Sequence, residues 1–287
     1  MASLKEIKGR IASVRSTLKI TSAMKMVASA KLHKAQMAIE GMLPYQKQLQ
    51  SVLSELLSSS SAAPVLRPSA VEEPSKRVAI VPFSSNSSLC GAFNANVIRE
   101  TSKRVDALRA EGYEVEFFPV GRKIAEAGRK MGFADFKDCS SLLEKSSYES
   151  ASEFAASLVE DWESGRFERV ELIYNHFVST GVQRVVSETY LPFDFSAGAA
   201  ERGRDGMFIV EPSREEVLAE LLSKVVRLKI YTVLLDTLAA EHAARTVAMQ
   251  TASDNAENIL QELTLEYNKS RQQKITAEIL DLVGGAQ

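Results

Sequence analysis

The chain has 287 residues, 45% of them apolar and 25% charged, which is typical of soluble globular proteins long enough for one or two cored domains. Its formal net charge of −2 argues against a generally basic nucleic-acid-binding protein. The two cysteines, Cys90 and Cys139, form no CxxC pair and no disulfide framework is expected, and no apolar run is long enough to span a bilayer.

A heptad pattern runs through the first 58 residues. Steps of three and four residues reach sixteen positions, of which thirteen are apolar. A repeat sustained over eight heptads favours a left-handed coiled coil over a helix on a globular surface. Pro44 predicts a local bend. The seam positions are Leu4, Ile7, Ile11, Val14, Leu18, Thr21, Lys25, Ala28, Leu32, Ala35, Ile39, Met42, Gln46, Leu49, Leu53 and Leu56.

A second long helix is predicted at the other end of the chain. Ser213 and Glu216 form a capping-box pattern, residues 213–283 contain no proline or glycine, and Gly284 follows as a stop. A helix of this length needs a partner to bury its apolar seam, and the first helix is the obvious one. The first fifty residues carry nine Lys or Arg against two acids, whereas residues 215–266 carry nine acids against four bases, which favours this pairing. The seam positions are Leu218, Leu221, Val225, Leu228, Thr232, Leu235, Ala239, His242, Thr246 and Ser253.

The middle of the chain has a different pattern. Residues 59–76 are rich in serine and proline and form a predicted linker, and residues 77–208 alternate between strand and helix patterns. The predicted fold class is α/β with a long coiled coil: an antiparallel coiled coil of residues 1–58 and 209–287 with an inserted Rossmann-like α/β domain. The predicted elements are a strand at Arg77–Phe83, a helix at Asn94–Ala110, a strand at Glu114–Val120, a short helix after Gly121, a helix at Glu149–Glu163 and a hairpin of Val170–Val178 with Val182–Leu191.

Few residues suggest chemistry. The loop Ser84–Gly91 lies where a phosphate-binding turn would lie, but with one glycine it matches neither GxGxxG nor a P-loop. A serine-rich turn whose helix caps on Asn94 is the favoured interpretation. No nucleophile–base arrangement stands out, and the two cysteines are expected to be packing residues. A metal site is not expected, because His33, His176 and His242 lie far apart in unrelated elements. No cofactor is expected either.

The surface of the first helix is unusual between residues 20 and 36. Met24, Met26 and Val27 fall off the seam, while Thr21 and Lys25 fall on it. A helix that is apolar on several sides is surrounded by partners, although a coil with a wide seam remains an alternative. Four lysines of this helix, Lys19, Lys25, Lys31 and Lys34, could form a stripe that binds nucleic acid. No aromatic residues for base stacking lie among them, so a solvated or partner-facing surface is the favoured interpretation.

Four segments closely resemble the gamma subunit of F-type ATP synthases. They read KITSAMKMVASAK (19–31), SLCGAFNANVIR (88–99), AAEHAARTVAM (239–249) and RQQKITAEI (271–279). The resemblance implies a non-catalytic central rotor stalk of the bacterial type. Its implied partners are three alpha and three beta subunits, an epsilon subunit and a membrane c-ring, whose rotation the stalk couples to ATP synthesis on the beta subunits.

The resemblance also implies partner-contacting residues. Met24 and Lys25 match positions near a beta-subunit loop, and Arg245 matches a position close to the same region. Family positions that bind beta-subunit loops near the top of the shaft correspond to Arg271, Gln272 and Thr276. The implied location is peripheral, on the cytoplasmic face of a bacterial plasma membrane, reached only through the complex. Two other functions stay open from the residues alone: a nucleotide-binding α/β protein that oligomerises through its terminal helices, and a static coiled-coil tether.

Overall fold

The structure is a computed structural model that describes residues 3–58, 75–193, 210–211 and 213–284, apart from the side chains at 54–55, 57–58 and 282–284. The chain divides into two compact units. The terminal unit consists of Met1–Ala30 and Arg245–Gln287, and the central unit is Lys31–Ala244. Most of the predicted linker, 59–74, and the end of the predicted α/β domain, 194–208, lie outside the described residues.

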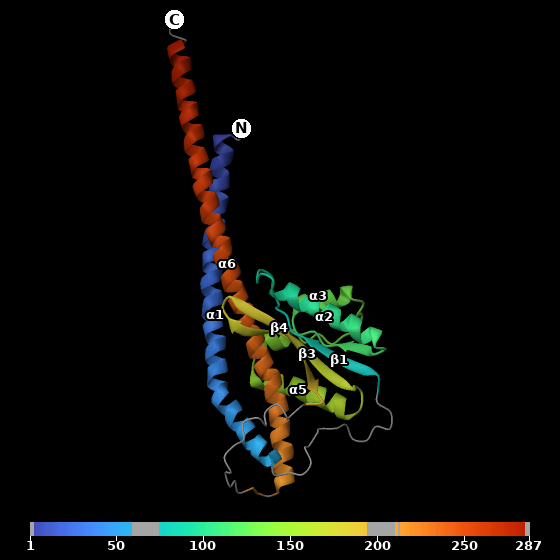
Figure 1. Ribbon diagram of the computed structural model, residues 1–287. Coiled ribbons are helices and arrows are strands. Elements are labelled where there is room, and N and C mark those ends of the chain that lie inside the picture. The colour runs from blue at the N-terminus through green and yellow to red at the C-terminus, as the bar shows by residue number, and fades with distance from the viewer. Residues whose placement is uncertain (1–2, 59–74, 194–209, 212, 285–287) are drawn as a thin grey trace. The chain divides into compact units, whose positions relative to one another are not determined.

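Helix α1 (Leu4–Ser58) follows the predicted heptad seam. All sixteen seam positions are buried or half-buried, including Thr21 and Lys25, whereas Lys19 and Met26 on other sides of the helix are exposed. The helix continues through Pro44, and Figure 1 shows the light-blue turns after it changing direction, as a proline inside a helix predicts.

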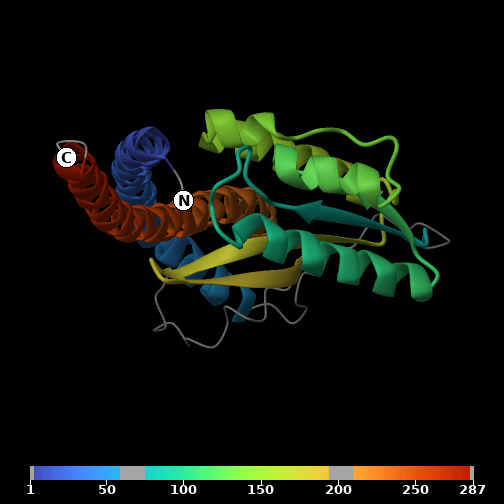
Figure 2. The same cartoon turned by 90° about the horizontal axis from the view of Figure 1, so that it is seen from above.

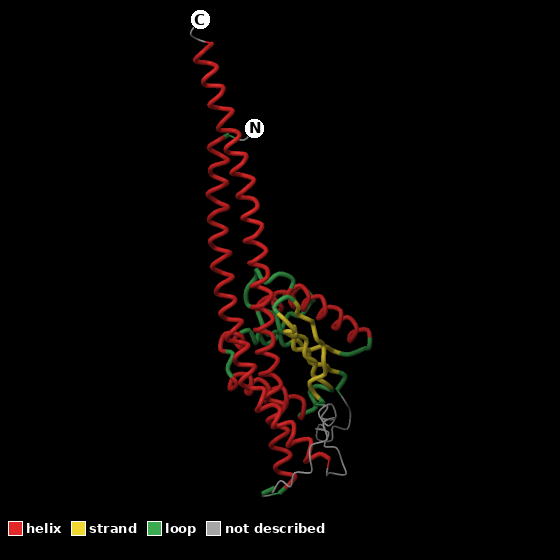
Figure 3. The backbone as a smooth tube through the Cα atoms, turned by 60° about the vertical axis from the view of Figure 1, so that its left-hand side comes forward, coloured by secondary structure: helices red, strands yellow, loops and turns green. Residues whose placement is uncertain are grey.

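Helix α6 (Arg214–Gly284) begins at the predicted cap, where the backbone N–H of Glu216 donates to Ser213 Oγ at 3.3 Å. In the central unit α6 packs against α1, and the two helices run side by side in Figures 1 and 3. Two clusters line this contact in antiparallel order, which confirms the predicted coiled coil: Met42 and Leu49 with Leu228 and Leu235, then Leu32 and Ala35 with Ala239 and Ala243.

The α/β domain contains a four-stranded sheet in the order β2-β1-β3-β4. Its strands are β1 (Arg77–Pro82), β2 (Glu114–Phe117), β3 (Arg169–Ser179) and β4 (Val182–Leu191). β1 pairs in parallel with β2 and β3, while β3 and β4 form the predicted antiparallel hairpin. The continuous burial of Val78–Pro82 is expected of a central parallel strand that is covered on both faces.

Helices cover both faces of this sheet. On one face α2 (Phe93–Ala110) and α3 (Arg122–Lys130) pack on β1 and β2. The other face carries α5 (Tyr148–Glu163), a helix predicted from the sequence, and the short α4 (Ser141–Lys145), which was not predicted. Figure 2 shows β1, in teal, between α2 on one side and further helices on the other.

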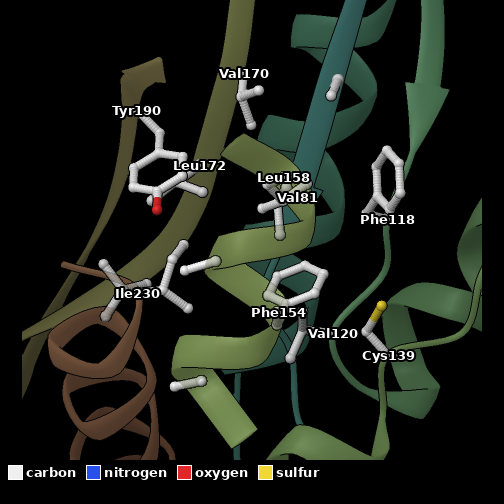
Figure 4. Packing of buried hydrophobic residues seen from close by; sticks show 14 of the residues in the cluster. Val81, Phe118, Val120, Cys139, Phe154, Leu158, Val170, Leu172, Tyr190 and Ile230 are labelled. Atoms are coloured by element: carbon white, nitrogen blue, oxygen red, sulfur yellow. The ribbon is translucent and has the colours of Figure 1, made fainter. Parts of the chain in front are cut away.

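Helix α6 also supplies part of the α/β core. Val226, Ile230, Val233 and Leu234 belong to the same buried cluster as residues of β1, β3, β4 and α5. Figure 4 shows Ile230 directed toward Leu172 and Tyr190, with Phe154 and Leu158 of α5 alongside. In the central unit α6 therefore buries one face against α1 and another against the sheet.

The start of α2 differs from the expectation. The helix begins at Phe93, and its capping residue Ala92 makes no side-chain hydrogen bond. The prediction that Asn94 caps the helix is wrong, because Asn94 lies inside the first turn, where side chains point back toward the N-terminus. There Asn94 Oδ1 accepts a hydrogen bond from the backbone N–H of Ser85 at 3.0 Å. The side chain thus closes the preceding loop instead of capping the helix.

Cys139 is predicted to resist alkylation. Burial raises the pKa of its thiol to about 11, above the value of about 8.5 for an unfolded thiol. The contribution of this thiol to stability is therefore complete below about pH 8.5 and declines as the pH rises toward 11. At pH 8 we expect iodoacetamide to modify Cys139 at least about 100-fold more slowly in the folded chain than in urea, measured by peptide-resolved mass spectrometry. Equal rates in the two states would contradict this burial effect.

Candidate partner-binding surface

The six residues that the resemblance assigns to partner contacts all lie in the terminal unit. This unit pairs the first part of α1 with the last part of α6. The first thirty residues carry six Lys or Arg and one acid, so the part of helix α1 in this pair is strongly basic. The surface of this two-helix unit is the candidate functional site.

A pair of hydroxyl groups joins the two helices where Thr21 and Lys25 interrupt the apolar seam. Thr21 Oγ1 and Ser253 Oγ lie 2.8 Å apart, and both side chains are buried. One turn further on, Lys25 Nζ donates to Gln250 Oε1 at 2.7 Å, and Gln250 Nε2 donates to Asp254 Oδ1 at 2.6 Å. The two helices are therefore linked by polar contacts at this level, beside the buried side chain of Met249.

Apolar side chains lie on the outside of the helix at this level. Ile20, Met26 and Val27 are 57%, 64% and 57% exposed, whereas Met24 is half-buried beside the seam. At 100° per residue, Ile20 and Val27 lie on one flank of the outer face and Met26 on the other. A two-helix pair leaves this apolar surface in water, which is the arrangement expected of a contact surface for other chains.

Arg245 is placed differently from the other predicted contacts. Its side chain is buried and interacts within the chain, so little of it is available on the outside of the unit. Lys25 is half-buried, and its amino group is held by Gln250. The contact role of these two cations stays a prediction, and Met24 is the one of the three whose apolar surface adjoins the exposed patch.

The last turns of α6 extend past the beginning of α1, as Figures 1 and 3 show. Every described side chain from Arg271 to Asp281 is exposed, including Gln272, Thr276 and the large apolar Ile279 and Leu280. Helical side chains of this type are usually buried against a second element. The end of α6 therefore offers a single-helix surface that carries both polar and apolar groups.

The attachment of α6 to the α/β domain was not predicted from the sequence. Asp236 Oδ1 accepts a hydrogen bond from the backbone N–H of Phe177 at 2.7 Å, and Asp236 Oδ2 lies 2.6 Å from His176 Nδ1. Tyr190 Oη donates to the Val226 carbonyl oxygen at 3.0 Å in a fully buried position. A second apolar stripe at four-residue spacing, Leu222, Val226, Ile230 and Leu234, was the sequence signal that could have predicted this attachment.

The loop Ser84–Gly91 is filled by its own side chains. Ser84 is fully buried, and its Oγ accepts the backbone N–H of Ile124 at 2.9 Å. Asn94 Nδ2 donates to Ser85 Oγ at 2.9 Å, and Cys90 packs with Phe93 against α6. These contacts use the polar groups that a phosphate would need, which supports the interpretation as a structural turn. Within the described residues, no group of three or more His, Cys, Asp or Glu side chains is arranged to hold a metal ion.

Comparison with known proteins finds, along nearly the whole chain, the same family that the four sequence motifs resemble. The family model described as ATP synthase matches residues 3–287. The ATP synthase gamma chain of Phocaeicola vulgatus is 55% identical over 289 residues, covering 100% of this chain and 99% of the relative. The gamma chain of Bacteroides fragilis is 54% identical with the same coverage. The chain belongs to the ATP synthase gamma-chain family. Its function as a central-stalk subunit follows from this membership, and the resemblance found in the four motifs is confirmed.

Solved structures share the gamma-chain fold. The rotor of the Euglena gracilis mitochondrial ATP synthase matches 95% of this chain and 98% of its own with a TM-score of 0.63 at 19% identity. The central stalk of the Tetrahymena thermophila mitochondrial enzyme matches 82% of this chain and 99% of its own with a TM-score of 0.56 at 23% identity. In the described part of this gamma chain, no helix has the combination of length and apolarity needed to cross a membrane.

Proposed function

We propose that this gamma chain is a non-catalytic rotor that transmits rotation of a membrane c-ring to three alpha and three beta subunits. The observation that carries the proposal is the terminal unit, whose paired helices are linked by polar groups around Thr21 and Ser253, while Ile20, Met26 and Val27 are exposed at the same level. Methionine repacks easily against different neighbours, which suits a surface that meets several partners in turn.

The rotor role requires a surface without threefold symmetry. Two unlike helices present different side chains in every direction, so three chemically identical beta subunits contact three different surfaces. Each contact can shift the open and closed populations of its subunit only by the free energy by which it differs between the two conformations. The asymmetry of the helix pair is therefore sufficient for sequential action, and ATP chemistry is assigned to the partners.

Torque needs a rigid path from the α/β domain into α6. The buried side chains of Val226, Ile230 and Val233, together with the Asp236 and Tyr190 hydrogen bonds, supply several contacts along one stretch of helix. Lys229 and Glu188 add an ion pair of 2.7 Å between α6 and β4. We assign the entry of torque to this stretch, and the membrane association to contacts of the α/β domain with an epsilon subunit and the c-ring on the cytoplasmic face.

The Met24→Lys variant is the direct test of the exposed contact surface. A lysine at this half-buried position can extend its amino group to water, so the chain should fold normally. In the assembled complex, however, it places a charge against an apolar partner contact. We expect the number of protons pumped per ATP hydrolysed to fall about five-fold, equivalent to about 1 kcal/mol of lost differential contact energy.

Two further variants separate this effect from a general one. Met24→Leu keeps the apolar contact and should retain coupling, whereas Ala110→Lys adds the same charge at the exposed end of α2 and should have no effect. Proton pumping is measured in inverted vesicles together with ATP hydrolysis. Unchanged coupling in Met24→Lys would refute the assignment of this surface as a drive contact.

A further inference from the structure

The sheet of the α/β domain has an open edge at β2. β2 pairs only with β1 among the described strands, and it is the first strand in the order β2-β1-β3-β4. In a doubly wound sheet, the chain that leaves the helix after such a strand usually returns as the next parallel strand beside it. Here residues 131–140 follow α3 without forming a strand, so this position in the sheet is not filled by a strand of the described chain.

A cavity of about 770 Å³ lies at this edge. Its lining comes from three places: β2 itself, the segment 134–137 after α3, and the last turns of α5 with Arg166 beyond them. Because α3 and α5 cover opposite faces of the sheet, the cavity lies between the two helical layers, at the height of the missing strand. Phe118 and Phe154, which are both buried and labelled in Figure 4, form an aromatic part of its wall.

Part of the backbone of β2 is available in this cavity. The N–H groups of Glu114 and Phe118 donate toward β1, to the carbonyls of Lys76 and Ile80 at 2.8 and 2.9 Å. Because successive N–H groups of a strand point to opposite edges, those of Val115 and Phe117 point away from β1. Beyond the end of β2, the backbone N–H of Cys139 already donates a hydrogen bond to the Pro119 carbonyl oxygen at 3.0 Å. The open edge is therefore short and extends from Val115 to Phe117.

The charges of the cavity favour a cationic occupant. Arg166 forms ion pairs with Glu116 and Asp161 and is thereby neutralised within the wall. Asp135 and Glu160 also line the cavity and are exposed, and neither makes an ion pair with any residue that the structure describes. Lys137 is the remaining base, and it also borders a neighbouring cavity of about 290 Å³. The wall therefore carries more carboxylates than basic groups, and these charges lie beside aromatic surface.

We propose that this sheet-edge cavity binds an extended, basic segment of a partner chain, which adds to β2 as a further parallel or antiparallel strand. The backbone of the segment bonds to the outer edge at Val115–Phe117, and alternate side chains enter the cavity. Arginine or lysine stems lie against Phe118 and Phe154, and their charged ends reach Asp135 and Glu160. The surface is separate from the terminal unit, and the inference does not depend on the rotor proposal.

The test uses the full chain and a fluorescein-labelled pentapeptide, acetyl-Thr-Arg-Val-Arg-Thr-amide, in a fluorescence anisotropy titration. We expect saturable binding at low salt that weakens as salt is added. The matched peptide with glutamate in place of both arginines should bind at least ten-fold more weakly. Two peptides with N-methyl groups at alternate residues, in the two possible registers, test the backbone bonds, and at least one of them should lose ten-fold or more in affinity.

Charge-reversal variants locate the binding site. Asp135→Lys combined with Glu160→Lys should weaken binding of the basic peptide at least ten-fold, because both side chains are exposed and belong to the cavity wall. Glu163→Lys is the matched control on the same helix, since Glu163 is exposed and outside the cavity wall, and it should leave binding nearly unchanged. Equal binding of basic and acidic peptides, or full binding to the double variant, overturns the proposal. Unchanged binding of both N-methylated peptides overturns strand addition.

Discussion

Replacing Ile230 with alanine should lower the free energy of unfolding of the α/β domain by about 3–4 kcal/mol. Ile230 is 1% exposed and lies where α6 enters the core of this domain, beside Leu172 and Tyr190. Removing three buried carbon atoms costs their transfer free energy and leaves a cavity that the sheet and α5 can fill only in part. The same substitution weakens the attachment through which torque is proposed to enter α6.

The measurement is urea unfolding followed by the fluorescence of Trp162. This residue is the only tryptophan of the chain and is buried in the same core as Ile230, so its signal reports on the domain in question. Ile230→Val removes one carbon and should cost about 1 kcal/mol. Ile275→Ala, at an exposed position near the end of α6, should change stability by less than about 0.5 kcal/mol. An Ile230→Ala variant as stable as the Ile275→Ala control would show that α6 is not part of the cooperative core.

Replacing Gly121 with alanine should destabilise the chain by about 3 kcal/mol or more. Gly121 precedes α3 with φ of 114°, a backbone conformation that residues with a Cβ rarely adopt. A Cβ at this position would lie 2.6 Å from both the carbonyl oxygen and the hydroxyl oxygen of Ser84. Ser84 cannot move away easily, because its N–H donates to Val120 and its Oγ accepts the N–H of Ile124.

Gly112→Ala provides the matched control for this prediction. Gly112 also has a positive φ, of 84°, but a Cβ there would have no heavy atom within 4 Å. The control should therefore cost only the backbone term, about 1–2 kcal/mol. The difference between the two variants, measured by urea unfolding, gives the cost of the contact with Ser84 together with the less favourable backbone conformation at Gly121. If both variants lose the same stability, the close packing of Gly121 on the loop contributes nothing.

The α1 seam could be predicted from the sequence because a heptad repeat is a local property. Each position from Leu4 to Leu56 has its neighbours three and four residues away, and the partner helix needs only a complementary stripe. The cap at Ser213 and the hairpin of β3 with β4 are local patterns of the same kind, and both were predicted close to their observed positions. The candidate surface around Met24 was also visible in the sequence, since Met26 and Val27 fall off the seam.

Other features depend on segments far apart in the chain. Asn94 was predicted to cap α2 because it follows a turn. In the folded domain its side-chain oxygen instead accepts a hydrogen bond from the backbone N–H of Ser85, because the folded turn brings Ser85 next to the start of α2. The burial of Arg245 could not be predicted from its neighbours in sequence. The open edge of β2 likewise depends on the failure of residues 131–140 to form a strand, which no periodicity reveals.

The sequence by itself determined the two long helices, their antiparallel pairing, the α/β insert and, through four motifs, the gamma-chain family. Only the tertiary structure decided that α6 has two buried faces in the central unit, one against α1 and one against the sheet. A heptad count registers a single stripe, whereas Val226, Ile230 and Leu234 form a second stripe whose burial requires a sheet assembled from strands between 77 and 191. Burial of that kind depends on contacts between distant segments, and these exist only once the whole domain has folded.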